Sequence, residues 1–180
     1  YKNKFVGDIH DLTTFSFDPV KTFTTIDGGL IVCKNKSQSK KLTEMRLMGI
    51  EKVKGITSSV NRLGYRYHLA NLHAAIGIEQ MKKIDLIKKN RIKYFNYYKK
   101  YLDGVKDLIR PEISPLTDVI PFHYCIKVKK RKAFMNFLLK NKIQTGIHWI
   151  PLHFFKYFEK FSKYSDLKVT QKIGREIVTL

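Results

Sequence analysis

"SFDPVKTFTTIDGG", residues 16–29, places one lysine between two segments whose composition predicts strands. Residues 12–17, LTTFSF, are apolar and β-branched enough for a buried strand, and residues 28–33, GGLIVC, predict a second one. Lys21 therefore lies in the loop that joins the two strands, five residues after Ser16. A strand that ends just before a turn would hold such a lysine at a fixed point.

The residue types of this loop fit a phosphorylated aldehyde cofactor. A lysine amine that can lose its proton forms a Schiff base with an aldehyde. The Ser16 hydroxyl could bind a phosphate, and Gly28 and Gly29 allow the backbone to approach a ligand closely. These roles suit pyridoxal phosphate. A lysine beside two glycines is also a common surface feature, so an ordinary surface residue stays the alternative.

The chain of 180 residues carries a formal net charge of +20 at pH 7. Its 43% of hydrophobic residues can bury a sizeable core, which argues against wholesale disorder. Most basic residues are lysine, whereas readers of nucleic-acid sequence rely on the bidentate guanidinium of arginine. The basic stretches 82–100 and 127–132 could bind phosphate backbones nonspecifically, or form the solvated faces of a helix and a turn. Nucleic-acid binding is therefore an alternative function that composition does not favour.

The termini and cysteines bound the class of protein further. No run of about 18 apolar residues predicts a membrane span. The start, YKNKFVGDIH, has neither an initiator Met nor a signal-peptide core, and we expect the chain to be a piece of a longer protein. Cys33 and Cys125 lie far apart and are expected to be reduced thiols of a cytoplasmic protein, with a disulfide between them as the alternative. Without a Cys-x-x-Cys or His-x-x-x-His motif, no metal site is expected.

Residues 1–104 predict a mixture of strands, helices and one long loop. Besides the two strands, the expected elements are a helix over residues 38–49 with Ser37 as its cap and Gly49 as its end, a loop over residues 50–64, and a long amphipathic helix from Leu69 to Gly104.

Residues 105–180 predict a small α/β domain that is incomplete at its end. A proline-containing connector, residues 110–121, leads into it. The expected elements are strands over residues 122–128, 143–149 and 176–180, and helices over residues 131–141 and 165–174. Alternating strands and helices indicate the α/β fold class.

The loop motif resembles the lysine motif of the DegT/StrS-type sugar aminotransferases, in the aspartate aminotransferase fold group. The matching positions are Ser16, Phe17, Lys21, Thr24, Thr25, Asp27, Gly28 and Gly29, with Asp27 where Glu is commoner. Further stretches resemble the family in the same order: GDI (7–9), RLMG (46–49), LGYRYHLANLHAAIGIEQMKKID (63–85) and TGIHWIPLH (145–153). The resemblance therefore covers nearly the whole chain.

The resemblance implies a role for several single residues. Lys21 would be the catalytic lysine that binds the cofactor and acts as general base, and Ser16 would hold the cofactor phosphate. Arg66 stands where the family has an Asn that reaches the phosphate of the neighbouring subunit's cofactor, and a guanidinium can grip phosphate at least as well. His68 replaces a family Arg, a second departure. His148 and His153 would lie near the substrate.

The resemblance also implies a fold and an activity. The fold would be a PLP-dependent transferase of fold type I, with residues 1–104 as the end of the PLP-binding large domain and residues 105–180 as the small domain. The full-length parent would be a cytoplasmic homodimer that moves an amino group, from glutamate, to a nucleotide-activated keto sugar for lipopolysaccharide or other cell-surface polysaccharide biosynthesis. The family's N-terminal half carries a phosphate-binding turn, a ring-stacking aromatic and an Asp for the pyridine nitrogen, so this piece alone is expected to be inactive.

Three alternatives stay open at this point. A sugar 3-dehydratase of the same family has His in place of the Schiff-base lysine, and Lys21 argues against it. A basic nucleic-acid-binding module would show salt-dependent affinity for any DNA. An inactive truncated relict of the family would lack the upstream half in its native gene.

Overall fold

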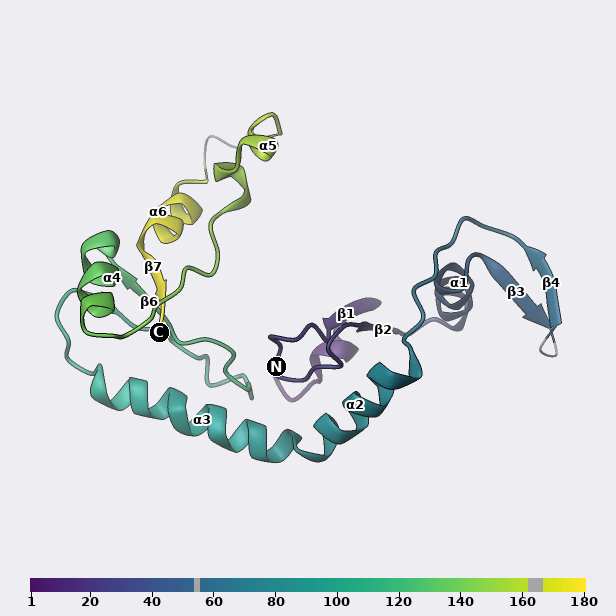
Figure 1. Ribbon diagram of the computed structural model, residues 1–180, viewed down its shortest axis with the longest axis horizontal. Helices are drawn as coiled ribbons and strands as arrows, with labels where there is room; N and C mark the ends of the chain where they lie inside the picture. The colour runs from purple at the N-terminus through teal and green to yellow at the C-terminus, as the bar shows by residue number, and fades with distance from the viewer. Residues whose placement is uncertain (54–55, 162–166) are drawn as a thin grey trace. The chain divides into compact units, whose positions relative to one another are not determined.

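The computed structural model describes residues 1–53, 56–161 and 167–180, which belong to two compact units (Figure 1). The first unit comprises Tyr1–Lys89 and Pro115–Asp118, and the second comprises Asn90–Ser114 and Val119–Leu180. The division falls within a helix, and the domain boundary expected after residue 104 stays a prediction.

The first unit contains the two strands that flank the Lys21 loop. β1 (Leu12–Ser16) pairs antiparallel with β2 (Gly29–Cys33), in a register that sets Leu12 opposite Cys33 and Ser16 opposite Gly29. Beyond the strands, the Phe17 amide donates to the Gly28 carbonyl at 3.0 Å. This last hydrogen bond closes the base of the loop. Both strands form where predicted, but the expectation that β1 is buried was wrong, because in this two-stranded sheet only Thr13 of β1 is half-buried and its other residues are exposed. A short 3-10 helix, η1 (Val6–Asp8), precedes β1.

Helix α1 (Lys36–Arg46) follows β2 and confirms the predicted helix. Its cap is Asn35, whose side-chain oxygen accepts from the Ser37 amide at 2.7 Å, so the expectation that Ser37 caps the helix was wrong. An Asn side chain directly before the helix can satisfy the amides that the first turn leaves unpaired. At the other end the Gly49 amide donates to the Glu44 carbonyl at 2.8 Å, with φ of +75° at Gly49. Gly49 thus ends the helix, as predicted.

Most of the predicted loop over residues 50–64 is instead a pair of strands, and of its described residues only 61–64 lack regular secondary structure as expected. β3 (Ile50–Val53) pairs antiparallel with β4 (Ile56–Val60), with Ile50 opposite Val60. The segment carries β-branched residues at spaced positions among polar ones, and this pattern suits a strand with one face exposed. Strands at a surface tolerate polar side chains, so the polarity of this segment does not indicate a loop.

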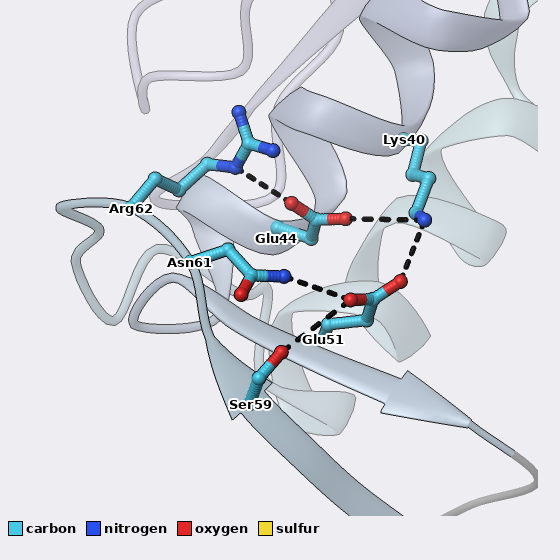
Figure 2. A network of polar contacts seen from close by, with 6 residues as sticks. All are labelled: Lys40, Glu44, Glu51, Ser59, Asn61 and Arg62. Carbon is cyan, nitrogen blue, oxygen red and sulfur yellow. Dashed lines mark hydrogen bonds and ion pairs between the residues drawn. The ribbon is translucent and has the colours of Figure 1, made fainter.

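Buried Glu44 ties α1 to the chain that follows the hairpin (Figure 2). Its side chain is 6% exposed, and one of its oxygens accepts from the Arg62 Nε at 2.6 Å. Lys40, one turn earlier on α1, lies 3.9 Å from the other oxygen. The carboxylate therefore has a close cationic partner on a segment 18 residues away in sequence.

Glu51 on β3 completes this network (Figure 2). Its carboxylate accepts from Lys40 Nζ at 2.6 Å, from Asn61 Nδ2 at 2.7 Å and from the Ser59 hydroxyl at 3.4 Å. Glu51 and Glu44 share Lys40. The helix, the hairpin and residues 59–62 are thus joined by one set of polar contacts.

The long helix expected from Leu69 to Gly104 is two helices. α2 (Asn71–Lys82) is followed by its C-cap Lys83, whose amide donates to the Gln80 carbonyl at 3.0 Å. α3 (Ile84–Tyr101) begins at the next residue. Asp85 lies in the first turn of α3, where a negative charge favours a new helix N-terminus. Apolar residues continue at helical spacing through both helices, so their periodicity does not predict the break between α2 and α3.

The second unit is built on a three-stranded antiparallel sheet in the order β5-β6-β7. β5 (Leu108–Ile109), β6 (Cys125–Val128) and β7 (Ile177–Thr179) accompany α4 (Arg131–Lys140), η2 (Leu152–Phe154), α5 (Lys156–Glu159) and α6 (Lys168–Glu176). Ile126 and Val178 face each other across the sheet with no exposed surface, and Tyr124 stacks against Tyr98 of α3 at 4.9 Å. This α/β arrangement is as predicted.

One predicted strand of the second unit is absent from the described residues. Residues 143–149 form only an isolated bridge, in which Gly146 and Thr179 exchange backbone hydrogen bonds of 2.9 and 2.8 Å. The β-branched composition suited a strand, but pairing with the end of β7 is limited to this one position. The expected helix over residues 165–174 begins outside the described residues and appears as α6.

The structure also tests the expectations for the two cysteines and for membrane-spanning helices. Cys33 and Cys125 are both half-buried free thiols, so the alternative of a disulfide does not apply. Within the described ranges, no helix is both long and apolar enough to span a bilayer.

The fold predicts unequal costs for two glycine substitutions. Gly49 and Gly104 have the same left-handed backbone, with φ of +75° and +70°. An added Cβ at Gly49 would collide with the Arg62 carbonyl oxygen, whereas at Gly104 it would meet nothing within 4 Å. We expect Gly104→Ala to lower the free energy of unfolding of the full-length protein by roughly 1–2 kcal/mol and Gly49→Ala by roughly 3–5 kcal/mol. Urea denaturation of both variants measures this, and equal losses would contradict it.

The Glu51 network predicts a pH dependence. A hydrogen bond from Lys40, then one from Asn61, lowers the pKa of the Glu51 carboxyl below its ordinary value. A lowered folded-state pKa stabilises the fold above the ordinary value, and this is lost as the pH falls through the folded value. Glu51→Gln should therefore be less stable than wild type at about pH 7, and the difference should shrink as the pH falls below about 4.3.

The matched control for this experiment is Glu112→Gln. Glu112 is exposed and makes no ion pair within the described part of the chain. Its substitution should leave the pH profile of unfolding as in wild type. A Glu51→Gln profile parallel to wild type over the same pH range would show that the network does not contribute.

Candidate cofactor and substrate site

Lys21 lies in the turn that follows β1, and its side chain is half-buried. Its amide donates to the Asp18 carbonyl at 3.0 Å, while the Asp18 carboxylate accepts from the Val20 amide at 3.1 Å. Such an Asx-type turn is typical of the sequence Asp-Pro in a loop. The backbone that carries Lys21 is therefore held by its own neighbours.

Two threonines brace the loop from inside. The Thr24 hydroxyl donates to the Phe17 carbonyl at 3.0 Å and accepts from the Ile26 amide at 2.8 Å. The Thr25 hydroxyl donates to the Asp27 carbonyl at 2.6 Å, and Thr25 is only 2% exposed. Both threonines belong to the motif that resembles the family's lysine motif, but the resemblance gave neither of them a role. Their hydroxyls are used within the loop, which gives it a defined shape.

Glycines let the loop pack directly on the start of α2. A Cβ at Gly77 would lie 2.8 Å from the Thr25 methyl, and a Cβ at Gly28 would lie 2.8 Å from a methyl of Leu69. The close approach expected at Gly28 therefore serves packing against Leu69 and Thr25. Gly77 belongs to the family-like stretch 63–85, and a glycine inside a helix signals close packing, but the sequence does not identify Thr25 as its partner.

Ser16 ends β1, close in sequence to the Lys21 turn. Its side chain is exposed, and its hydroxyl oxygen accepts a 3.4 Å hydrogen bond from the Asp18 amide. That contact leaves the hydroxyl hydrogen available for a phosphate oxygen. The strand end and the turn thus carry a hydroxyl and an amine on one short stretch.

Arg66 lies on a segment that runs along the C-terminal end of α1. The Tyr65 and Tyr67 amides donate to the carbonyls of Met45 and Arg46 at 2.8 and 2.9 Å. The two tyrosine rings stack at 5.2 Å with 21° between their planes. Residues two apart in extended chain share a face, so the Arg66 side chain extends from the other face, where it is exposed. Across the described residues it has no hydrogen bond or ion pair.

The two histidines lie in the second unit. His148 Nδ1 is 3.0 Å from the Thr179 hydroxyl, and its ring stacks on His123 at 4.4 Å. His153 packs edge-on against Phe154 at 4.7 Å, and its Nε2 is buried without a hydrogen-bond partner among the described residues. Lys21, Ser16 and Arg66 thus share the first unit, whereas His148 and His153 share the second.

The first-unit residues have the chemistry that a phosphorylated aldehyde requires. Lys21 provides an amine, and Ser16 and Arg66 provide a hydroxyl and a guanidinium whose donors no described group consumes. Guanidinium groups bind phosphate through charge-assisted hydrogen bonds. Over the described ranges, no three candidate ligands cluster in a way that could hold a metal ion.

The chain matches the model of the DegT/DnrJ/EryC1/StrS aminotransferase family over residues 1–180. It is 33% identical over 170 residues to the UDP-4-amino-4,6-dideoxy-N-acetyl-beta-L-altrosamine transaminase of Campylobacter jejuni subsp. jejuni serotype O:23/36, with 89% of this chain and 44% of that protein covered. It is 27% identical over 170 residues to the GDP-perosamine synthase of Escherichia coli O157:H7, with 91% and 45% covered. The chain therefore spans about half the length of the curated relatives it matches.

A solved structure shows the same fold. The sugar aminotransferase CalS13 from Micromonospora echinospora aligns with a TM-score of 0.91 at 24% identity, over 100% of this chain and 49% of that one. The predicted fold class is thus confirmed. Since the family model matches the whole of the chain, this protein belongs to the DegT/DnrJ/EryC1/StrS aminotransferase family.

Proposed function

We propose that the full-length protein is a pyridoxal phosphate-dependent aminotransferase that moves an amino group from glutamate to a nucleotide-linked keto sugar. One observation carries this proposal: a chain of an aminotransferase family presents Lys21 on a short, internally braced loop. The relatives named above are a UDP-amino-sugar transaminase and a GDP-perosamine synthase, which supports a nucleotide-linked sugar as substrate. Glutamate as donor and cell-surface polysaccharide, such as lipopolysaccharide, as destination follow from the resemblance.

Lys21 is the proposed catalytic residue. Pyridoxal phosphate, when bound, supplies an aldehyde for an amine and a ring that accepts electrons. Lys21 Nζ would hold the aldehyde carbon and, once released, would take up and return a proton as general base. The braced loop supports this role because a proton carrier must keep its position through both half-reactions.

Ser16 and Arg66 are the proposed phosphate ligands. Ser16 would donate its hydroxyl hydrogen from the strand end next to the Lys21 turn. Arg66 would contribute a charge-assisted contact from its exposed side chain, to the cofactor of a neighbouring subunit. This assignment requires a homodimer, which we propose on the same grounds as the site.

His148 and His153 are the proposed substrate ligands. His153 supports this role better, because its buried Nε2 lacks a partner among the described residues and a buried polar atom without a partner is unfavourable. His148 already contacts Thr179 and His123, so its contribution would be an oriented imidazole. We further propose that the enzyme is cytoplasmic and that this chain alone is inactive, because the remaining half of the relatives' length would carry the other cofactor contacts.

Borohydride reduction of the native protein tests the role of Lys21. We expect a pyridoxyl adduct that peptide mapping places on Lys21, since reduction fixes the bond between this amine and the cofactor. Lys21→Ala should carry no adduct. Lys34→Ala, at the exposed end of β2, serves as the matched lysine control and should be labelled like wild type. A wild-type protein without an adduct would favour the inactive relict.

Arg66→Met should weaken the binding of pyridoxal phosphate. A hydrogen bond to a charged group contributes about 1.5–3 kcal/mol, so the dissociation constant should rise roughly tenfold to a hundredfold. Titration of the full-length dimer by absorbance measures it. Lys41→Met removes an exposed cation of α1 in the same unit and should leave the affinity unchanged. Equal affinities of Arg66→Met and wild type would remove Arg66 from the site.

A further inference from the structure

We propose that the buried ion pair between Glu44 and Arg62 positions Arg66 for its phosphate ligand. This inference rests on the proposed function of Arg66. Neither Glu44 nor Arg62 is proposed to touch the cofactor, so both are positioning residues.

The first step is the burial of Glu44. At 5% exposure it is the one buried carboxylate within the described ranges. Burial of a carboxylate is costly unless the charge is paired. Arg62 Nε supplies that pair at 2.6 Å, and Lys40 adds a second cation at 3.9 Å. Loss of either member of the Glu44–Arg62 pair would leave the other charge without its close partner.

The second step is the double role of Glu44 at the end of α1. Its backbone carbonyl accepts from the amides of Leu47 and Gly49 at 2.9 and 2.8 Å, which ends the helix. Its side chain holds Arg62 (Figure 2). Glu44 therefore links the C-terminal end of α1 to Arg62, on the segment that follows the hairpin.

The third step is how closely the returning chain lies on the helix end. A Cβ at Gly64 would fall 2.6 Å from the Met45 carbonyl oxygen, and one at Gly49 would overlap the Arg62 carbonyl oxygen. The Asn61 amide also donates to the Gly49 carbonyl at 3.2 Å. Backbone contacts of this kind leave little freedom to the residues between them.

Arg66 is the residue that this arrangement holds. Its two neighbours, Tyr65 and Tyr67, are hydrogen-bonded to α1, and Arg62 anchors the same segment four residues earlier. The backbone of Arg66 is thus fixed while its guanidinium stays exposed. A preorganised donor binds an anion more tightly because less freedom is lost on binding. Release of the Glu44–Arg62 anchor should therefore weaken phosphate binding through Arg66.

A double-mutant cycle on the full-length protein tests this inference, with pyridoxal phosphate as the titrated probe. We expect Glu44→Gln to raise its dissociation constant roughly three- to tenfold, because residues of one salt-bridge network couple by about 0.5–3 kcal/mol. In the Arg66→Met background the same substitution should have no further effect. Glu79→Gln breaks the exposed 2.6 Å pair with Lys82 on α2 and is the matched control, with no change expected.

A second readout does not depend on the cofactor. Hydrogen exchange should be faster at the Tyr65 and Tyr67 amides in Glu44→Gln than in wild type, because their hydrogen bonds to α1 open more often. Arg62→Met removes the other charge of the pair, and it serves if Glu44→Gln does not fold. The double variant Glu44→Arg with Arg62→Glu exchanges the two charges and should recover part of the affinity for pyridoxal phosphate that Glu44→Gln loses.

The outcomes separate this inference from the proposed function. A wild-type protein that does not bind pyridoxal phosphate overturns both. If wild type binds it, an unchanged affinity in Glu44→Gln or Arg62→Met overturns the positioning role alone. A loss of equal size in the Arg66 and Arg66→Met backgrounds also overturns it, because the effect would then not pass through Arg66.

Discussion

Close approach of chain segments at glycines is the constraint on which the first unit depends. At Gly49 and Gly64 the chain after the hairpin lies backbone to backbone on the end of α1, and at Gly77 α2 lies against the Thr25 side chain of the Lys21 loop. A side chain at any of these positions would push the two segments apart. The loop with the lysine and the segment with Arg66 therefore occupy defined places in one unit, although 45 residues of sequence separate them.

Charge has two uses in this chain. Most of its excess positive charge belongs to exposed lysines, which suit a solvated surface. A small set of charges works differently, since Glu44 and Glu51 hold Lys40 and Arg62 in a network that joins a helix to a hairpin. The proposed site would use one exposed charge and one buried pair. The exposed Arg66 guanidinium would bind the ligand, and the buried Glu44–Arg62 pair would hold the backbone of Arg66.

Much of the fold was predictable because its signals are local. β1, β2 and α1 were predicted from β-branched runs and helix-ending glycines, and the structure has them near those bounds. The wrong predictions concern stretches in which two local patterns compete. Asn35 and Ser37 are both good caps, and only the geometry shows that Asn35 is used. Residues 50–60 include polar side chains typical of loops, yet β3 and β4 within this stretch form two paired strands.

The resemblance of several motifs to one family indicated the family, and the residue types of short stretches predicted the α/β class and the lysine loop. Contacts between residues far apart in sequence depend on the folded structure. Nothing in the spacing of Glu44 and Arg62 predicts their contact, which exists because the hairpin returns the chain to the helix end. The same holds for Gly77 and Thr25, which α2 brings together. Local preferences act over a few residues, whereas burial and charge pairing act on whatever the folded chain places side by side.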